Sequence, residues 1–235
     1  RYFYYENPNK DLPLLVLIHG APGSSSALLN FLENKLITEN YSVLILDRMG
    51  YGYSNYGEFA SIQKQSELII SLVKGLVQKN QAVFIAGHSY GGTVAACISA
   101  MQPSFLKATA LMAPALDPNN EKYFWFGKIA YWKATRWMVS AALRVSADEK
   151  YTHAEELKQI EPNWEKINSP ILHIHGDKDN IVPFINLNYT QSKFPKAYYN
   201  QYVWKDMNHF FPFTSTQQTS EILHQFFYQF KDDKK

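Results

Sequence analysis

The chain has 235 residues, of which 46% are hydrophobic, 15% aromatic and 19% charged. This length and composition predict one globular domain with a sizeable core, and they exclude a disordered or low-complexity chain. The 23 basic and 21 acidic side chains give a formal net charge of +2, which gives no reason to expect a nucleic-acid partner. The single cysteine, Cys97, excludes a disulfide framework, and its apolar neighbours predict a small buried side chain.

The sequence contains no apolar run close to the ~18 residues that a membrane-spanning helix requires, so no stable membrane insertion is expected. The chain begins at Arg1 rather than at methionine, so a targeting segment can lie upstream of it. Localisation therefore stays open, with the cytoplasm favoured, and the oligomeric state is not predicted.

Short apolar runs alternate with longer stretches of helical periodicity along most of the chain. The runs predict strands at Leu14–Ile18, Val43–Leu46, Ala82–Ala86, Ala108–Met112 and Ile171–Ile174. They are continuous rather than alternating, as strands buried on both faces are. An edge strand over Arg1–Tyr5 and a more exposed strand over Tyr198–Trp204 complete the set. The pattern predicts an α/β fold, a mostly parallel central sheet with helices on both faces.

The alternation breaks between Leu116 and Pro170, where no strand is predicted. This stretch is rich in aromatic residues and ends with a more polar helix over Asp148–Ile160. We therefore expect a single domain with a core of residues 1–115 and 171–235 and a helical insertion of residues 116–170. Most of the aromatic rings are expected to pack the insertion onto the core and a minority to line a substrate pocket, with three candidates to test, Trp125, Trp132 and Trp137.

The strongest chemical signal is Gly87-His88-Ser89-Tyr90-Gly91, a G-x-S-x-G sequence between a predicted buried strand and a predicted helix over Thr93–Met101. A serine on such a sharp turn has strained backbone angles, and glycines on either side relieve the crowding. The dipole of the following helix would stabilise an oxyanion beside the serine. Ser89 is therefore the candidate nucleophile, the alternative being an ordinary strand-to-helix turn.

A serine hydroxyl needs a general base to activate it. His209 is the candidate, because it follows the last predicted strand in a loop flanked by apolar residues. The other histidines fall in turns or on predicted strands and helices, where a structural role is expected: His19, His88, His153, His173, His175 and His224. Asp179, just past a strand end, is the candidate acid that orients the imidazole, with Asp177 and Asp117 as alternatives.

The chain order Ser89, Asp179, His209 is the serine–acid–histidine order of α/β-hydrolases, and the sequence resembles a serine hydrolase of this fold over nearly its whole length. Three segments carry the resemblance. They are His19-Gly20-Ala21-Pro22-Gly23, similar to the family's H-G-x-P-G oxyanion turn; Asp47–Ser54, similar to the D-R-x-G-x-G-x-S turn of the epoxide-hydrolase-like, esterase and C–C-hydrolase branches; and Gly176–Pro183, similar to the stretch that carries the acid.

The resemblance implies a cap over the active site, formed by residues 116–170, and places the acid at Asp179. Epoxide hydrolases and haloalkane dehalogenases have an aspartate where this chain has Ser89, so their chemistry is disfavoured. The family usually begins with more than one strand before the H-G turn, so we expect further residues upstream of Arg1. The oxyanion donors are expected to be the backbone N–H of Tyr90 and that of Ala21, since Pro22 has none. The turn around Asp47 and Arg48 is expected to brace this site rather than to touch substrate.

The leading functional hypothesis is hydrolysis of a small-molecule carboxylic ester with an apolar acyl or alcohol group, through an acyl-enzyme. A second hypothesis is an aminopeptidase similar to proline iminopeptidases, which would need cap carboxylates for a substrate ammonium. Five are available in the sequence, at Glu121, Asp148, Glu149, Glu155 and Glu156, although the aromatic part of the insertion is basic. Three more hypotheses stay open, a C–C-bond hydrolase or a cofactor-free lyase on the same triad and a ligand-binding receptor that retains the triad.

No metal-ligand spacing and no phosphate or dinucleotide fingerprint is present, so a reaction without cofactor or metal is expected. The stretch from Lys122 to Met138 mixes tryptophan with lysine and arginine, as helices on membrane surfaces do. We rank this interfacial hypothesis below the enzymatic ones.

Overall fold

The computed structural model describes residues 1–79, 81–125 and 127–231 of the chain. The described residues form a seven-stranded sheet in the order β1-β3-β2-β4-β5-β6-β7. Its strands are β1 (Tyr2–Tyr5), β2 (Leu14–Ile18), β3 (Ser42–Leu46), β4 (Val83–His88), β5 (Leu106–Met112), β6 (Ile171–Gly176) and β7 (Tyr199–Trp204). The edge strand β1 runs antiparallel to β3 and the remaining pairs are parallel. The predicted α/β fold with a mostly parallel sheet is confirmed.

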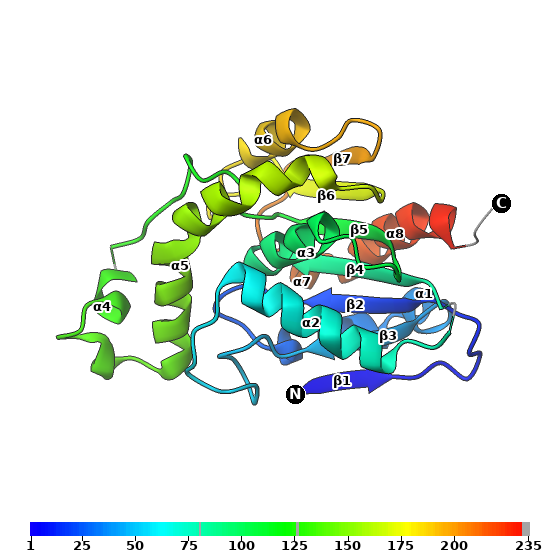
Figure 1. The fold of residues 1–235 in the computed structure, drawn as a ribbon, viewed down its shortest axis with the longest axis horizontal. Helices are drawn as coiled ribbons and strands as arrows, with labels where there is room; N and C mark the ends of the chain where they lie inside the picture. Colours follow the sequence, from blue (N-terminus) through cyan, green and yellow to red (C-terminus); the bar gives the residue numbers. More distant parts are fainter. Residues whose placement is uncertain (80, 126, 232–235) are drawn as a thin grey trace.

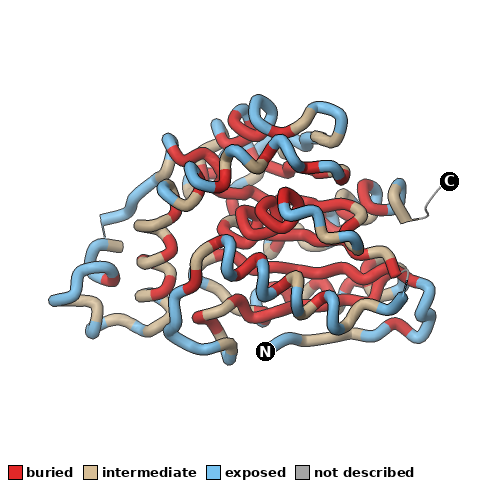
Figure 2. Tube along the Cα trace, in the orientation of Figure 1, coloured by how far each residue is buried: buried red, intermediate tan, exposed pale blue. Residues whose placement is uncertain are grey.

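Helices cover both faces of the sheet (Figure 1). On one face, α2 (Ile62–Leu76), α3 (Tyr90–Ala100) and α6 (Asn186–Lys193) enclose a core with the side chains of β2 and β4. On the other face lie, in chain order, the 3₁₀ helix η1 (Ser25–Glu33), α1 (Lys35–Thr38), α7 (Phe211–Thr214) and α8 (Thr216–Phe227). The central strands are buried throughout (Figure 2), which explains their continuous apolar sequences.

Residues 113–170, which we call the β5–β6 segment, contain four helical elements and no strand among their described residues. The elements are α4 (Gly127–Tyr131), η2 (Arg136–Met138), α5 (Ala141–Ile160) and η3 (Glu161–Lys166). Helix α4 and the first part of α5 lie beyond the carboxyl ends of the parallel strands (Figure 1), the edge of the sheet at which Ser89 lies, whereas the last turns of α5 pack onto the core.

Two predicted helix starts are wrong. Helix α5 begins at Ala141 rather than Asp148, because the hydroxyl of Ser140 accepts the N–H of Leu143 and caps the helix earlier. Helix α3 begins at Tyr90 rather than Thr93. In both cases the first turns carry few large apolar residues, so hydrophobic periodicity does not mark them.

Helix α4 packs onto α5 through its inner face. Ala130 is buried, and the ring of Tyr131 stacks on Tyr151 with 4.1 Å between ring centroids. The tryptophans of the segment take the outer side, where Trp125 is 76%, Trp132 59% and Trp137 73% exposed. These three candidate rings therefore do not pack onto the core, and their contribution to a substrate pocket stays a prediction.

Candidate active site

Ser89 lies on the sharp turn between β4 and α3, with a positive φ of 55°. Residues other than glycine rarely adopt this conformation, which costs energy and is found mainly where function requires it. A Cβ on Gly87 would lie 2.2 Å from the carbonyl oxygen of Gly91, and a Cβ on Gly91 would lie 2.4 Å from that of His19. Both glycines are therefore required for the turn, as the sequence predicted. The Ser89 side chain is partly exposed.

The turn after β2 lies directly beside Ser89. A Cβ added to Gly20 would come within 3.0 Å of the Ser89 Cβ, so the chain that leads to Ala21 passes against the serine. The ring of His19 fixes this turn, because its Nδ1 is 2.7 Å from the Gly20 oxygen and its Nε2 accepts the N–H of Arg48 at 3.0 Å. Burial, together with the Arg48 charge, lowers the pKa of His19 to about 3 and keeps the ring neutral.

His209 and Asp179 form a short hydrogen bond between the loops that follow β7 and β6. Nδ1 of His209 donates to Oδ2 of Asp179 at 2.6 Å, and both side chains are buried. The second carboxylate oxygen accepts the backbone N–H groups of Ile181 and Val182 at 2.8 and 2.9 Å. Burial alone would raise the pKa of Asp179, but hydrogen bonds from His175 and His209 outweigh it and hold this pKa below its ordinary value. The carboxylate thus fixes the proton on Nδ1 of His209 and leaves Nε2 as the basic nitrogen.

The neighbour of Ser89 binds the backbone of His209. Nε2–H of His88 donates to the His209 carbonyl oxygen at 3.0 Å, and the two rings lie 4.7 Å apart between centroids. Burial lowers the pKa of His88 to about 3, so this ring is neutral. Between the Ser89 hydroxyl and His209 there is no hydrogen bond in the described part of the chain. Such contacts are often long in unliganded hydrolases and shorten with substrate.

The two alternative acids are engaged elsewhere. Asp177 is exposed and accepts the N–H of Asp206, whereas Asp117 accepts hydrogen bonds from Asn119 and Asn120. Of the three candidate carboxylates, Asp179 is the one bonded to His209.

Behind Asp179 lies a line of buried polar groups that sequence reasoning did not find. Nε2 of His175 lies 3.4 Å from the Asp179 carboxylate and 3.2 Å from the Val182 carbonyl. Both of these groups accept, so Nε2 of His175 carries the proton and its Nδ1 accepts from Nε2–H of His173 at 2.9 Å. Nδ1 of His173 then accepts from the Thr190 hydroxyl at 2.7 Å. The hydrogen bonds from Thr190 through His173 and His175 to Asp179 thus all have the same donor-to-acceptor direction.

A second buried network joins the β5–β6 segment to the turn beside Ser89. Arg48, which is 1% exposed, donates to the carbonyl oxygens of His19 and Gly20 at 2.9 and 3.1 Å. The same guanidinium pairs with Glu149 of α5 at 2.5 Å, and the Tyr51 hydroxyl donates to the second Glu149 oxygen at 2.6 Å. The carboxylate further raises the already high pKa of Arg48, against the effect of burial. This arrangement agrees with the predicted bracing role of Arg48, because its guanidinium donates hydrogen bonds to two carbonyl oxygens of the turn.

Two surface hollows, of about 450 and 410 Å³, lie apart from this site. They are lined by Lys158, Glu161, Pro162, Glu165 and Lys193, and by Tyr131, Trp132, Lys133, Arg136 and Asp148. Within the described ranges, no group of three or more His, Cys, Asp or Glu side chains is placed to hold a metal ion. In the same ranges, no helix is long and apolar enough to cross a membrane.

The mostly parallel sheet and the serine at positive φ on a strand-to-helix turn define the class of protein, the α/β-hydrolase fold. Residues 10–155 match the hydrolase family described as serine aminopeptidase, S33, and the chain belongs to this family. The predicted resemblance to serine hydrolases of this fold is confirmed.

Relatives agree with this placement at a coarse level. A putative esterase/lipase of Haemophilus influenzae is 29% identical over 125 residues, 53% of this chain but only 41% of that protein. A putative carbamate hydrolase, RutD, of Pseudomonas savastanoi is 26% identical over 220 residues, 80% of this chain and 83% of that one. Among solved structures, the α/β-hydrolase MGS-M2 from a deep-sea metagenome library superposes with a TM-score of 0.77 and 18% identity, covering 99% and 95% of the two chains.

Proposed function

We propose that the protein hydrolyses small-molecule carboxylic esters through an acyl-enzyme formed on Ser89. The observation that carries the proposal is the 2.6 Å bond between Asp179 and His209, located beside a serine held at positive φ. A neutral imidazole oriented by a carboxylate is the base that a serine hydroxyl requires.

In the proposed reaction, Nε2 of His209 takes the Ser89 proton as Oγ attacks the ester carbonyl. The backbone N–H groups of Ala21 and Tyr90 stabilise the tetrahedral oxyanion, at roughly 3–4 kcal/mol per donor in well-studied cases. His209 then protonates the leaving alcohol as the C–O bond breaks. Water attacks the acyl-enzyme as His209 takes its proton, and His209 gives this proton to Oγ of Ser89 as the acyl C–O bond breaks and the acid leaves. Asp179 stays ionised and stabilises the imidazolium in both steps.

We further propose that residues 116–170 act as a cap over Ser89 and supply no triad member. The position of α4 and the first part of α5 beyond the carboxyl ends of the strands supports this role (Figure 1). With the three tryptophans on the outer side, substrate selection falls to side chains of α5 and of the loops at the sheet edge.

An aminopeptidase is the second candidate, because the family's description names one. Such an enzyme needs a free carboxylate for the substrate ammonium. All five predicted cap carboxylates already have partners: Glu121 with Lys150 and His153, Asp148 with Arg136, Glu149 with Arg48, Glu155 with Gln159, and Glu156 with Thr152 and the N–H of Ile62. This internal pairing favours the esterase. A C–C-bond hydrolase and a receptor that retains the triad use the same site residues, and no observed contact favours either.

The proposal is tested by labelling and by substrate choice. A fluorophosphonate probe should label the wild-type protein at one residue, and Ser89→Ala should lose the label while keeping its circular dichroism spectrum. The wild-type protein should hydrolyse p-nitrophenyl esters of graded acyl length faster than aminoacyl anilides. Full labelling of the Ser89→Ala variant would refute the nucleophile, and faster cleavage of the anilides would favour the peptidase. A protein that takes the label but turns over neither substrate would point to the receptor.

A further inference from the structure

The end of the β5–β6 segment carries a concentration of exposed aromatic side chains. We call residues 122–138 the aromatic tip; they include α4 and η2, and residue 126 lies outside the described ranges. Trp125, Trp132, Trp137 and Met138 are each 59% or more exposed. The other two tryptophans of the chain, Trp164 and Trp204, lie in the body of the protein and are buried or half-buried.

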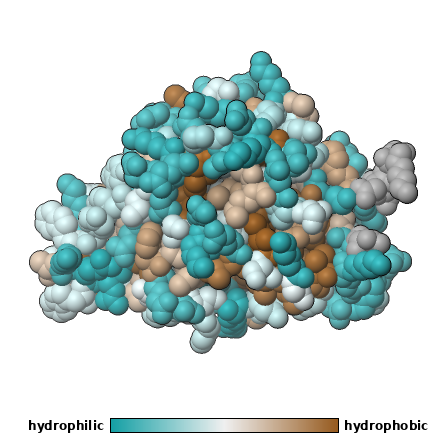
Figure 3. Space-filling view, in the orientation of Figure 1, coloured by the Kyte–Doolittle hydropathy of each residue, from teal (hydrophilic) through white to brown (hydrophobic). Residues whose placement is uncertain are grey.

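The exposed large hydrophobic side chains are not distributed evenly over the surface. Of the twenty large hydrophobic side chains that are exposed among the described residues, nine lie between positions 123 and 143. Single exposed apolar residues are ordinary, whereas a contiguous group marks an interaction surface. In Figure 3 the corresponding end of the molecule is pale rather than brown, because the scale gives tryptophan and tyrosine intermediate hydropathy. Such amphipathic rings favour the boundary between water and an apolar phase.

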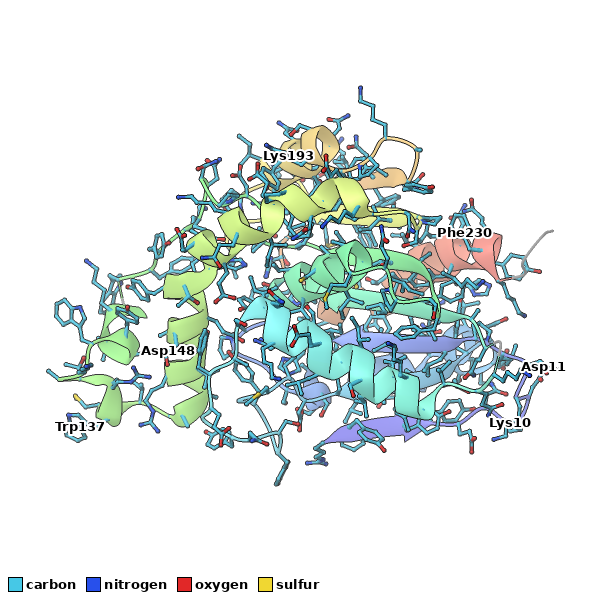
Figure 4. All side chains as sticks on the ribbon, viewed as in Figure 1. Lys10, Asp11, Trp137, Asp148, Lys193 and Phe230 are labelled. Atoms are coloured by element: carbon cyan, nitrogen blue, oxygen red, sulfur yellow. The ribbon has the colours of Figure 1, made fainter. Side chains whose placement is uncertain are left out.

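The tip projects from the body of the protein, so that a flat surface can approach it. Helix α4 uses Ala130 and Tyr131 against α5, so its remaining side chains face away from the body. The tip lies at the end of the molecule opposite α8 (Figure 1), and the Trp137 side chain lies at its outer limit (Figure 4).

The charge of the same segment is one-sided. Residues 122–147 contain five Lys or Arg side chains and no Asp or Glu, although the whole chain has a net charge of only +2. Arg136 is paired with Asp148 of α5, and the Lys122 ammonium donates to the Asn180 carbonyl. Lys128 and Lys133 are exposed on the tip among the tryptophans.

We infer that the aromatic tip docks on an anionic lipid surface, with Trp125, Trp132, Trp137 and Met138 in the interfacial layer and Lys128 and Lys133 at the headgroups. Tryptophan alternating with lysine suits such a lipid surface, because the interfacial layer accommodates the rings and the anionic headgroups attract the ammonium groups. A second copy of the chain fits the tip poorly, because two basic tips would repel each other. This inference does not depend on the proposed hydrolase activity.

The test measures binding of the full chain to sedimented vesicles of phosphatidylcholine and of phosphatidylcholine with 30 mol% phosphatidylglycerol. We expect binding to the anionic vesicles at 0.05 M salt, a blue shift of tryptophan emission on binding, and release at 1 M salt, where charges are screened within about 3 Å. The double variant Trp125→Ala/Trp137→Ala should reduce the partition coefficient at least ~10-fold. Lys128→Gln/Lys133→Gln should reduce it about 25-fold, at about five-fold per charge.

Matched controls separate the tip from general effects. Tyr228→Ala removes an aromatic side chain that is 62% exposed near the other end of the molecule, and Lys74→Gln/Lys196→Gln removes the same charge from exposed sites elsewhere. Both controls should bind vesicles as the wild-type protein does. The inference is overturned if the wild-type protein does not sediment with anionic vesicles at low salt, or if the tip variants bind as tightly as the controls. It is also overturned if the Trp variants instead convert a dimer to a monomer in light scattering, which would assign the tip to a second copy.

Discussion

The hydrogen bonds around Asp179 explain how a single carboxylate stays ionised in a buried place. Its Oδ1 receives two backbone N–H groups, and its Oδ2 faces the protonated nitrogens of His209 and His175. The His173–His175 contact fixes which nitrogen of His175 carries the proton. In the proposed mechanism His175 is a positioning residue, because it contacts Asp179 and not the substrate.

The acid is tested by a pair of substitutions two positions apart. Asp179→Asn should lower kcat about 10⁴-fold, because an amide supports the wrong tautomer of the histidine. Asp177→Asn is the matched control and should change kcat by less than about two-fold, since Asp177 is exposed and contacts the N–H of Asp206. Both variants are measured with the best p-nitrophenyl ester of the graded panel. The reverse ranking of the two variants would assign the acid to Asp177.

The positioning role of His175 predicts a difference between two replacements. His175→Leu removes the donor to Asp179 and should lower kcat 10–100-fold with little change in KM, as loss of an orienting partner does. His175→Gln keeps an N–H near Nε2 and should retain most of the activity. The pH–rate profile is the decisive measurement, because the weakened carboxylate should move its acid limb in the Leu variant alone. Equal losses in the two variants, with unchanged pH profiles, would mean that His175 only fills space.

At the scale of elements, the sequence predicted those features that depend on a short local pattern of residues. The ends of the predicted strands lie within two residues of the observed ones, because continuous apolar runs identify strands buried on both faces. Ser89, Asp179 and His209 were each predicted from a turn or loop next to a strand end. The structure brings Asp179 and His209 into contact, and their roles remain to be tested.

The contacts between distant elements could not be predicted in this way. Arg48 and Glu149 are 101 positions apart, and nothing in the local sequence of α5 distinguishes Glu149 from its exposed neighbour Glu155. Which face of α5 meets the core depends on how the whole segment packs. The outward position of the tryptophans could not be predicted either, because the stacking of Tyr131 on Tyr151 of α5 determines which face of α4 turns inward.

The Arg48–Glu149 pair connects α5 to the turn after β2, which predicts a large effect on stability. Glu149→Leu leaves the buried guanidinium without its carboxylate and should lower the free energy of unfolding by about 3–5 kcal/mol, measured by urea denaturation. Glu155→Leu is the control on the same helix and should change it by less than about 0.5 kcal/mol, because Glu155 is exposed. If Glu149→Leu is as stable as the control, the pair does not hold α5 to the core.

Loss of the Glu149 carboxylate should also lower the reactivity of Ser89. Arg48 donates to the carbonyls of His19 and Gly20, so a displaced guanidinium should loosen the turn that carries Ala21. Glu149→Gln, which keeps the size of the side chain, should lower the rate of fluorophosphonate labelling of Ser89 at a temperature where the variant is fully folded. An unchanged labelling rate would confine the pair to a role in stability.

At the scale of the whole molecule, the carboxyl ends of β2, β4, β6 and β7 place the Ala21-bearing turn, Ser89, Asp179 and His209 at one edge of the sheet. This edge is held by buried neutral histidines rather than by charges alone. His19 fixes the turn, His88 the backbone of His209, and His173 the partner of the acid. The integrity of the site is therefore coupled to the protonation of these rings.

This coupling predicts a loss of stability in mild acid. Burial lowers the pKa of His19 and of His88 to about 3 and that of His173 well below its ordinary value, whereas in the unfolded chain each would titrate near 6.5. Below pH 6.5 the unfolded state therefore binds more protons than the folded state, so stability is complete above this pH and is lost as the pH falls toward 3. Three such groups should lower the free energy of unfolding by roughly 3–4 kcal/mol between pH 6 and pH 5. Urea denaturation at the two pH values measures this slope. His88→Gln, whose amide can still donate to the His209 carbonyl, should reduce it by about 1.4 kcal/mol per pH unit, the contribution of one proton. A variant with the wild-type slope would show that His88 is not the neutral ring that this structure requires.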